Sequence, residues 1–243
     1  MPLKRSSGPE LAPIARGSRS RRRPPAAAAG ATSLPRVLAY ARREPSAVLF
    51  LLQLAGILLY PFMVGDARPL FSAFGILVLG LVVLAVRDSP GLTWVAVSIG
   101  LPAVVLLVLQ VVADNDALNP WSSAFEAALY FYAAYALLRS MLADHIVTRD
   151  ELWGIGASFT LLAWAFAYLY VVVQAVEPGS FGAPERTWME LLFLSCTTLS
   201  STGLSDIVPV EPFARGVVML EQLAGLGFVA MVVSRLVALT VRR

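Results

Sequence analysis

Charged side chains are scarce in this sequence of 243 residues, and cysteine and histidine each occur only once. Only 14% of the residues are charged and 58% are hydrophobic, a composition far outside the range of soluble globular domains. The single cysteine, Cys196, excludes an internal disulfide and a cysteine metal cluster, and we interpret it as a small packing residue. With no second histidine, nucleophile motif or glycine-rich phosphate loop, nothing supports enzyme chemistry or a cofactor. We predict an all-α integral membrane protein that is not an enzyme.

The first 44 residues are rich in Arg, Pro, Ser and Ala and offer too little apolar surface to fold. Five arginines gather there: Arg16, Arg19, Arg21, Arg22 and Arg23. We predict a disordered cytoplasmic tail at 1–44 that sets topology and contacts anionic lipid, not nucleic acid. The Arg22-Arg23 pair would also suit a twin-arginine export signal, but no apolar stretch follows it directly, so the tail is the favoured interpretation.

Six apolar segments approach the roughly 20 residues that a helix needs to cross the hydrocarbon core. They are 46–64, 69–86, 92–113, 122–142, 152–176 and 215–239. Arginines (Arg87, Arg139, Arg149, Arg242 and Arg243) fall on the side of the basic tail, and acidic residues (Asp114, Asp116, Glu177 and Glu211) fall opposite. This asymmetry predicts that both termini are cytoplasmic.

The stretch 191–209, between the last two segments, carries small hydroxyl residues that are unusual between two membrane spans. They are Ser195, Thr197, Thr198, Ser200, Ser201 and Thr202, followed by Gly203 and Asp206. Non-helical backbone at membrane depth is tolerated only where protein buries it or where it lines a watery cavity. A short helix that enters, turns at Gly203 and returns extended would expose carbonyls and hydroxyls to an aqueous axis, as an ion-selectivity filter does. Thr187 as N-cap, with Glu190 completing a capping box, predicts this helix over 188–199.

Residues 198–209, T-L-S-S-T-G-L-S-D-I-V-P, resemble without a gap the pore signature of tetrameric potassium channels, commonly T-L-T-T-V-G-Y-G-D-I-V-P. The segments 148–150, 177–181 and 212–235 also resemble the bacterial six-span relatives of this family. The resemblance implies six transmembrane helices, with a re-entrant pore helix and filter loop between helices five and six. It divides the chain into the tail, a four-helix domain at 45–147 and a pore domain at 148–243.

The resemblance assigns cation binding to the filter loop and a supporting role to four residues around it. The filter residues are Ser201, Thr202, Gly203 and Leu204, and the supporting residues are Ser205, Asp206, Thr197 and Glu221. Leu204 replaces a tyrosine and cannot donate its phenolic hydrogen bond. Ser205 replaces a glycine of positive φ, where another residue costs roughly 1–2 kcal/mol. Asp206 could bond back to the pore helix, with Thr197 the nearest partner. We expect secure inner cation sites and weakened outer ones, so that selectivity for potassium over sodium is most at risk.

The last segment carries two further candidates. Gly225 follows Gly203 by 22 positions (225 − 203), the spacing of the family's gating hinge; close helix packing is the alternative explanation. Glu221 lies deep in this segment and should face the protein, bonded to Ser195 or Thr198, because a carboxylate facing lipid is unfavourable.

The fourth segment decides whether voltage is sensed. It carries only Glu126 and Arg139, whereas a sensor needs several cations, and four subunits each moving one charge fully would supply roughly 9 kcal/mol per 100 mV. We therefore predict a voltage-insensitive domain. Its aromatic residues Tyr130, Phe131, Tyr132 and Tyr135 are interpreted as packing rather than a ligand cage. The one histidine, His145, is interpreted as a solvated loop residue rather than a pH sensor.

One filter strand cannot surround an ion, so four subunits are required. The leading hypothesis is a homotetrameric, passive, potassium-channel-like cation channel of the bacterial inner membrane, conducting K⁺ or Na⁺ and needing no small-molecule substrate. The alternative is a non-conducting membrane scaffold or modulatory subunit with a decayed filter. The T-G-L-S string also resembles pore loops of Trk-type potassium uptake proteins, but those carry four such loops in a longer chain.

Overall fold

The computed structural model describes residues 44–62, 68–85, 90–113, 115–143 and 149–241, and every regular element in these ranges is helical. The long helices are α2 (Pro45–Leu59), α3 (Arg68–Ala85), α4 (Pro90–Ala113), α5 (Asn119–Ala143), α6 (Arg149–Val176) and α8 (Pro212–Val241). The shorter α7 (Trp188–Leu199) separates α6 from α8, and two 3-10 turns are η1 (Tyr60–Phe62) and η3 (Asp116–Leu118). The predicted all-α fold is confirmed over the described residues. Residues 1–43 of the predicted tail and His145 lie outside them.

Prolines mark the starts of five helices. Pro45, Pro90 and Pro212 are the first residues of α2, α4 and α8, and Pro69 and Pro120 are the second residues of α3 and α5. A proline in the first turn forfeits no intrahelical hydrogen bond and already has a helical φ. Proline would interrupt the interior of a helix but is tolerated in its first turn, so each of these helices begins at or directly before its proline.

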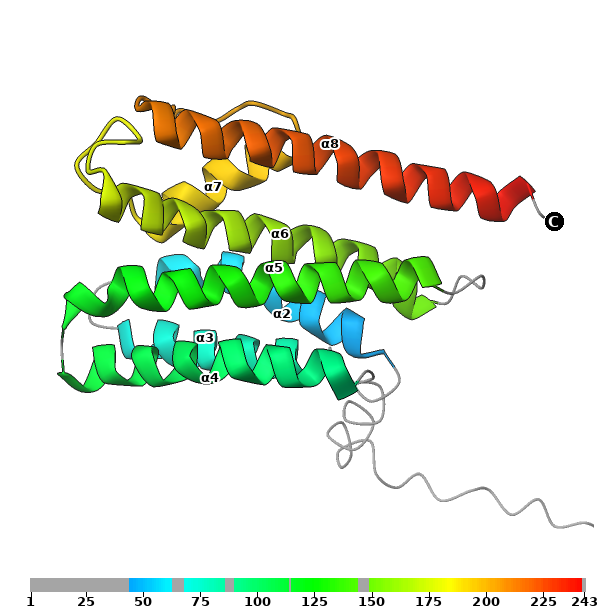
Figure 1. Cartoon of the computed structure of the whole chain (residues 1–243), viewed down its shortest axis with the longest axis horizontal. Helices are drawn as coiled ribbons and strands as arrows, with labels where there is room; N and C mark the ends of the chain where they lie inside the picture. Colours follow the sequence, from blue (N-terminus) through cyan, green and yellow to red (C-terminus); the bar gives the residue numbers. More distant parts are fainter. Residues whose placement is uncertain (1–43, 63–67, 86–89, 114, 144–148, 242–243) are drawn as a thin grey trace, which may run out of the picture.

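The helices lie side by side in layers, with α6 near the middle (Figure 1). The pair α3 and α4 forms one outer layer, α5 and α2 both pack against α6, and α7 lies obliquely between α6 and α8. The C-terminal half of α8 runs on beyond α7 to the end of the described chain. The N-terminal helices therefore meet the last three mainly along α6, and Tyr60 of η1 also packs against Trp188 at the start of α7, with ring centroids 5.6 Å apart.

Two polar contacts tie α2 to α6. The backbone N–H and the hydroxyl of Ser46 both donate to the Asp150 carboxylate, at 3.1 and 2.9 Å. Farther along the same two helices, Thr160 donates to the side-chain oxygen of the fully buried Gln53 at 2.7 Å. Buried polar groups are costly unless they are hydrogen-bonded, so these contacts fix which faces of the two helices meet.

An aromatic cluster fills the contact between α5, α6 and the start of α7. Tyr130 stacks on Tyr168 with ring centroids 5.6 Å apart, and Trp164 meets the edge of Trp188 at 5.1 Å. Such pairs add to the stabilisation from area burial. The interpretation of the aromatic group of α5 as packing is confirmed for Tyr130, which is fully buried, and for Phe131, which packs edge-on against Phe166 at 4.9 Å. Tyr135, in contrast, is exposed.

Among the described residues, three helices are long and apolar enough to cross a membrane: Pro45–Phe62, Leu152–Val176 and Pro212–Val237. Within the described side chains of α3 and α4 the apolar parts are shorter, Ala73–Val83 and Trp94–Gln110. Each of the six predicted segments corresponds to one long helix. The chain is therefore a helical membrane protein.

Candidate functional site

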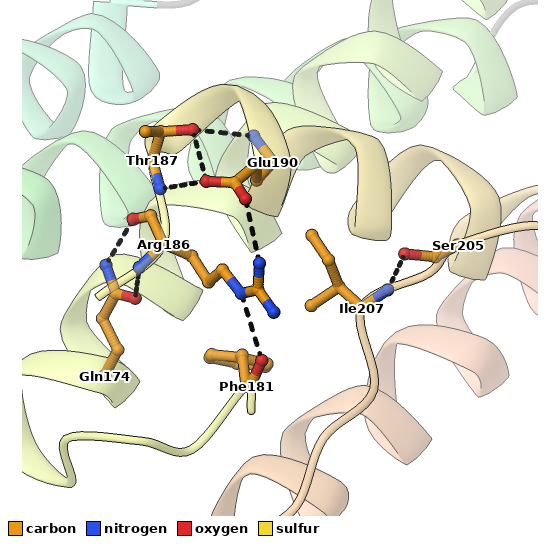
Figure 2. Close-up of polar contacts among 7 residues, drawn as sticks. All are labelled: Gln174, Phe181, Arg186, Thr187, Glu190, Ser205 and Ile207. Carbon is orange, nitrogen blue, oxygen red and sulfur yellow. Dashed lines mark hydrogen bonds and ion pairs between the residues drawn. The ribbon is translucent and has the colours of Figure 1, made fainter. Parts of the chain in front are cut away.

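The first turn of α7 is closed by Thr187 and Glu190 (Figure 2). The Thr187 hydroxyl accepts from the Glu190 N–H at 3.4 Å, and the Glu190 carboxylate accepts from the Thr187 N–H at 2.7 Å. This reciprocal capping box satisfies donors that a helix start leaves unpaired. The predicted helix 188–199, its N-cap and its capping box are all confirmed.

Glu190 also places a negatively charged carboxylate in the first turn of α7. The Thr187 backbone N–H, then the Thr187 hydroxyl and the Arg186 guanidinium, hold the pKa of Glu190 below its ordinary value. Arg186 pairs with Glu190 at 3.0 Å. An ionised carboxylate is favourable here because the N-terminal end of a helix carries partial positive charge.

Arg186 is itself held from two directions. The Gln174 amide at the end of α6 pairs with both backbone groups of Arg186, at 2.9 Å each (Figure 2). The Arg186 Nε donates to the Phe181 carbonyl at 3.2 Å. The segment between α6 and α7 is thus bonded to both helices, and α7 starts from a fixed position.

The opposite end of α7 closes in a left-handed turn at Ser201. With a φ of 59°, Ser201 is the one non-glycine residue of the described chain with positive φ. Its N–H donates to the Thr198 carbonyl, and the Thr202 N–H donates to the Thr197 carbonyl, both at 3.0 Å. This pairing satisfies carbonyls that a helix end leaves free. It places a serine where glycine is the usual residue, at a cost of roughly 1–2 kcal/mol.

The four predicted filter residues follow in one exposed loop. They are Ser201, Thr202, Gly203 and Leu204. Within the described residues their carbonyl oxygens accept no hydrogen bond. Nearby, the hydroxyls of Ser200 and Thr202 lie 3.0 Å apart. Free oxygens therefore gather next to the C-terminal end of α7, which carries partial negative charge.

The predicted strain at Ser205 is wrong, because positive φ occurs at Ser201 and at Gly203 but not at Ser205. The Ser205 hydroxyl instead accepts from the Ile207 N–H at 3.0 Å (Figure 2). A serine hydroxyl can stabilise a local turn in this way. The Ile207 side chain is buried, so the loop returns to the protein core directly after Ser205.

The predicted bond between Asp206 and Thr197 is not formed. The Thr197 hydroxyl donates to the Leu194 carbonyl within α7, at 2.9 Å, and the Asp206 residue is exposed. Both residues are described, and no hydrogen bond joins them.

Glu221 of α8 faces the protein and is fully buried. Its carboxyl group lies within hydrogen-bond distance of the Ser195 hydroxyl on α7 and of the Tyr170 hydroxyl on α6. Of the two predicted partners, Ser195 makes the contact, while no bond to Thr198 occurs among the described residues. One side chain thus joins the three helices around the loop.

Gly225 lies one helical turn beyond Glu221 and touches the end of α7. A Cβ atom at this position would lie 2.1 Å from the Leu199 carbonyl oxygen and 3.0 Å from the Leu199 Cα. Only a residue without a side chain lets the two backbones approach so closely. Gly225 follows Glu221 by four residues on α8 (225 − 221), and its partner Leu199 follows Ser195 by four residues on α7 (199 − 195). The two contacts therefore lie along one shared face. This geometry favours close packing as the role of Gly225, and a hinge role stays a prediction.

Sequence reasoning missed three residues that build the site. Tyr170 is fully buried and contacts Glu221. Gln174 and Arg186, which hold the start of α7, were not singled out. A polar residue near the end of an apolar helix was the available signal for Gln174. Its partner is the backbone of a residue 12 positions away, and no local pattern identifies such a contact.

The last three helices and their loop define a class of membrane protein in which a short helix ends beside a loop of free oxygens between two long apolar helices. A family model described as "Ion channel" matches residues 157–242. A curated relative, Protein LctB of Geobacillus stearothermophilus, is 30% identical over 106 residues, which cover 40% of this chain and 78% of that protein. No solved structure matches. The chain belongs to the potassium-channel-like family of ion channels.

Proposed function

We propose that the chain forms a passive cation channel of the potassium-channel type, with Ser201, Thr202, Gly203 and Leu204 as its filter and Ser205, Asp206, Thr197 and Glu221 as supporting residues. The observation that carries the proposal is the loop of free carbonyl oxygens at the C-terminal end of α7. Backbone carbonyls replace the hydration shell of a permeating cation in such filters, and the negative helix end favours positive charge. K⁺ and Na⁺ are the permeant ions, and no resident cofactor is required.

The proposal places six helices across the bilayer of a bacterial inner membrane, with both termini in the cytoplasm. The short α7, of 12 residues, enters from the outer side and its loop returns there. Such a path is viable only where protein surrounds it. The basic tail would then contact anionic lipid on the cytoplasmic side.

A pore of this kind is a homotetramer, because a single loop presents oxygens to only one side of an ion. In agreement with this, α8 keeps Glu221 buried but exposes Leu220, Leu223 and Leu226, each more than 60% accessible. In the tetramer these leucines face neighbouring copies or lipid. The proposed channel is insensitive to voltage, since α5 carries only Glu126 and Arg139, and Glu126 is buried and hydrogen-bonded to Tyr168.

A second candidate, a non-conducting scaffold or modulatory subunit, is favoured by the outer half of the loop. Leu204 is 78% exposed, and the backbone at Ser205 does not take the left-handed conformation of the family's second filter glycine. Outer carbonyls arranged by that glycine are therefore displaced. In the conducting form of the proposal the same departure predicts relaxed selectivity for K⁺ over Na⁺.

The test is cation flux in proteoliposomes that hold the purified full chain, with K⁺ and Na⁺ gradients compared. Gly203→Ala is the loop variant: the φ of Gly203 is 65°, and a Cβ there meets no atom of its own chain within 4 Å, so within the subunit only backbone strain is added. Gly179→Ala is the matched control, with a φ of 90° and equally open space outside the loop. A channel predicts flux that falls about tenfold or more in Gly203→Ala, because 1–2 kcal/mol of strain repopulates other loop conformations, and unchanged flux in Gly179→Ala. Absence of flux from a verified tetramer would instead support the scaffold.

A further inference from the structure

The hydroxyl and carboxyl groups of Glu221, Ser195 and Tyr170 lie in mutual contact. If Glu221 were ionised, these groups would have too few hydrogens for the acceptors that they meet. The Tyr170 hydroxyl meets one carboxyl oxygen of Glu221, and the Ser195 hydroxyl meets the other. Ser195 also lies 2.8 Å from the carbonyl oxygen of Ala163 on α6. All three side chains are fully buried, so no bulk water completes the set.

Counting protons distinguishes two charge states of this contact. A serine hydroxyl has one proton to donate, yet Ser195 faces two acceptors if Glu221 is ionised. One of its two short oxygen contacts would then lack a hydrogen. If Glu221 carries a proton, it donates to Ser195, Ser195 donates to the Ala163 carbonyl, and Tyr170 donates to the second carboxyl oxygen. Every contact then has one donor and one acceptor.

The charges around Glu221 lead to the same state. The titratable groups that face it are Tyr170 from α6 and Cys196 from α7. Both are neutral when protonated and can supply no positive charge. Among the described residues no Lys or Arg pairs with Glu221. An isolated buried carboxylate is so costly that such a group takes up a proton instead.

We propose that Glu221 is a neutral carboxylic acid that donates a hydrogen bond to Ser195, so that a proton, not an ion pair, fastens α7 between α6 and α8. The contact lies one helical turn before the meeting of Gly225 and Leu199, at the end of α7 that leads into the loop. Glu221 is therefore a positioning residue for the loop. Its effect on conduction rests on the proposed function, whereas its protonation does not.

The direct test is the infrared difference spectrum between the wild-type full chain and Glu221→Gln at neutral pH. A neutral acid predicts that the substitution removes the carbonyl stretch of a protonated carboxyl group and leaves the carboxylate bands unchanged. Loss of a carboxylate band instead overturns the proposal. Glu126 is also buried and could contribute a second carboxyl band. The spectrum of Glu126→Gln is the control that identifies this band.

Stability provides an independent test. Glutamine can donate to Ser195 and accept from Tyr170 as the neutral acid does, so Glu221→Gln should change the unfolding equilibrium constant less than about threefold. Ser195→Ala and Tyr170→Phe should each raise it about tenfold or more, because each leaves a buried partner unpaired. An ionised Glu221 needs two hydrogen-bond donors. If Glu221 is ionised, Glu221→Gln should raise the unfolding equilibrium constant as much as Ser195→Ala and Tyr170→Phe do.

The chain offers a matched control for each truncation. Ser158 is also fully buried, but within the described part of the chain its hydroxyl donates only to carbonyls of its own helix, Gly154 and Ile155. The Tyr130 hydroxyl is buried and has no hydrogen-bond partner among the described residues. Ser158→Ala and Tyr130→Phe should therefore change stability little. If they cost as much as Ser195→Ala and Tyr170→Phe, the contact has no special role and the proposal fails, whether or not the protein conducts.

Discussion

Replacing Gly225 with alanine tests the contact between α7 and α8 most directly. The new Cβ would lie 2.1 Å from the Leu199 carbonyl oxygen, and real Cβ contacts do not fall below 3.0 Å, so the backbones must separate by at least 0.9 Å (3.0 − 2.1). Overpacking of this kind costs about 1–3 kcal/mol, and the obstacle here is backbone, which cannot rotate aside. Alanine in a helix returns about 1 kcal/mol. Because the obstacle is backbone, we take the upper end of the overpacking range, about 3 kcal/mol, and expect a net loss of about 2 kcal/mol (3 − 1).

The control is Gly227→Ala, two residues further along the same helix. A Cβ at Gly227 meets no atom within 4 Å, so this substitution should stabilise the helix by up to about 1 kcal/mol. The two variants should therefore differ by about 3 kcal/mol, or roughly a hundredfold in the unfolding equilibrium constant. Equilibrium unfolding of the purified full chain in mixed micelles measures this difference. Trp164 and Trp188, 5.1 Å apart between α6 and α7, provide the fluorescence signal.

The outcome also separates packing from a gating hinge. If Gly225→Ala is as stable as Gly227→Ala, the close approach to Leu199 is not a stabilising contact and our reasoning is refuted. If stability is retained and only flux is lost, Gly225 acts as the predicted hinge. A fall in both stability and flux is the result that close packing predicts.

Two further predictions concern the ends of α7. The lowered pKa of Glu190 means that its carboxylate stabilises the fold above its ordinary pKa, and this stability is lost as the pH falls through the lower folded-state pKa; Thr187→Ala should cost about 1 kcal/mol. Acid titration of unfolding in the wild type and Glu190→Gln checks this, and identical curves would contradict it. Ser201→Gly should stabilise the chain by about 1 kcal/mol, because it relieves a residue held at a φ of 59°. Ser205→Gly, at a residue without positive φ, should not; equal gains in thermal or denaturant unfolding would place the strain elsewhere.

The elements of this protein were predictable because their signals are local. The apolar segments correspond to the long helices, and prolines such as Pro90 and Pro212 mark where helices begin. The limits of α7 were predicted because the capping box of Thr187 and Glu190 spans only four residues. The inward face of Glu221 was predictable as well, since a buried carboxyl group must find polar partners.

The contacts that position the loop could not be predicted in the same way. Gln174 bonds the backbone of Arg186, and Tyr170 reaches Glu221 across 51 positions of sequence. The φ of Ser201 depends on how the end of α7 closes, so the residue type alone placed the strain wrongly at Ser205.

The sequence by itself determined the class of this protein: an apolar, helical chain with a filter-like motif between its last two long helices. Hydrophobic composition, helix caps and a contiguous motif are short-range properties, and they can be recognised in a sequence without knowledge of the fold. Only the tertiary structure decided how that motif is supported. It placed Gly225 against Leu199 and Glu221 between α6 and α7, because those distances and the resulting proton count depend on the packing of three helices together.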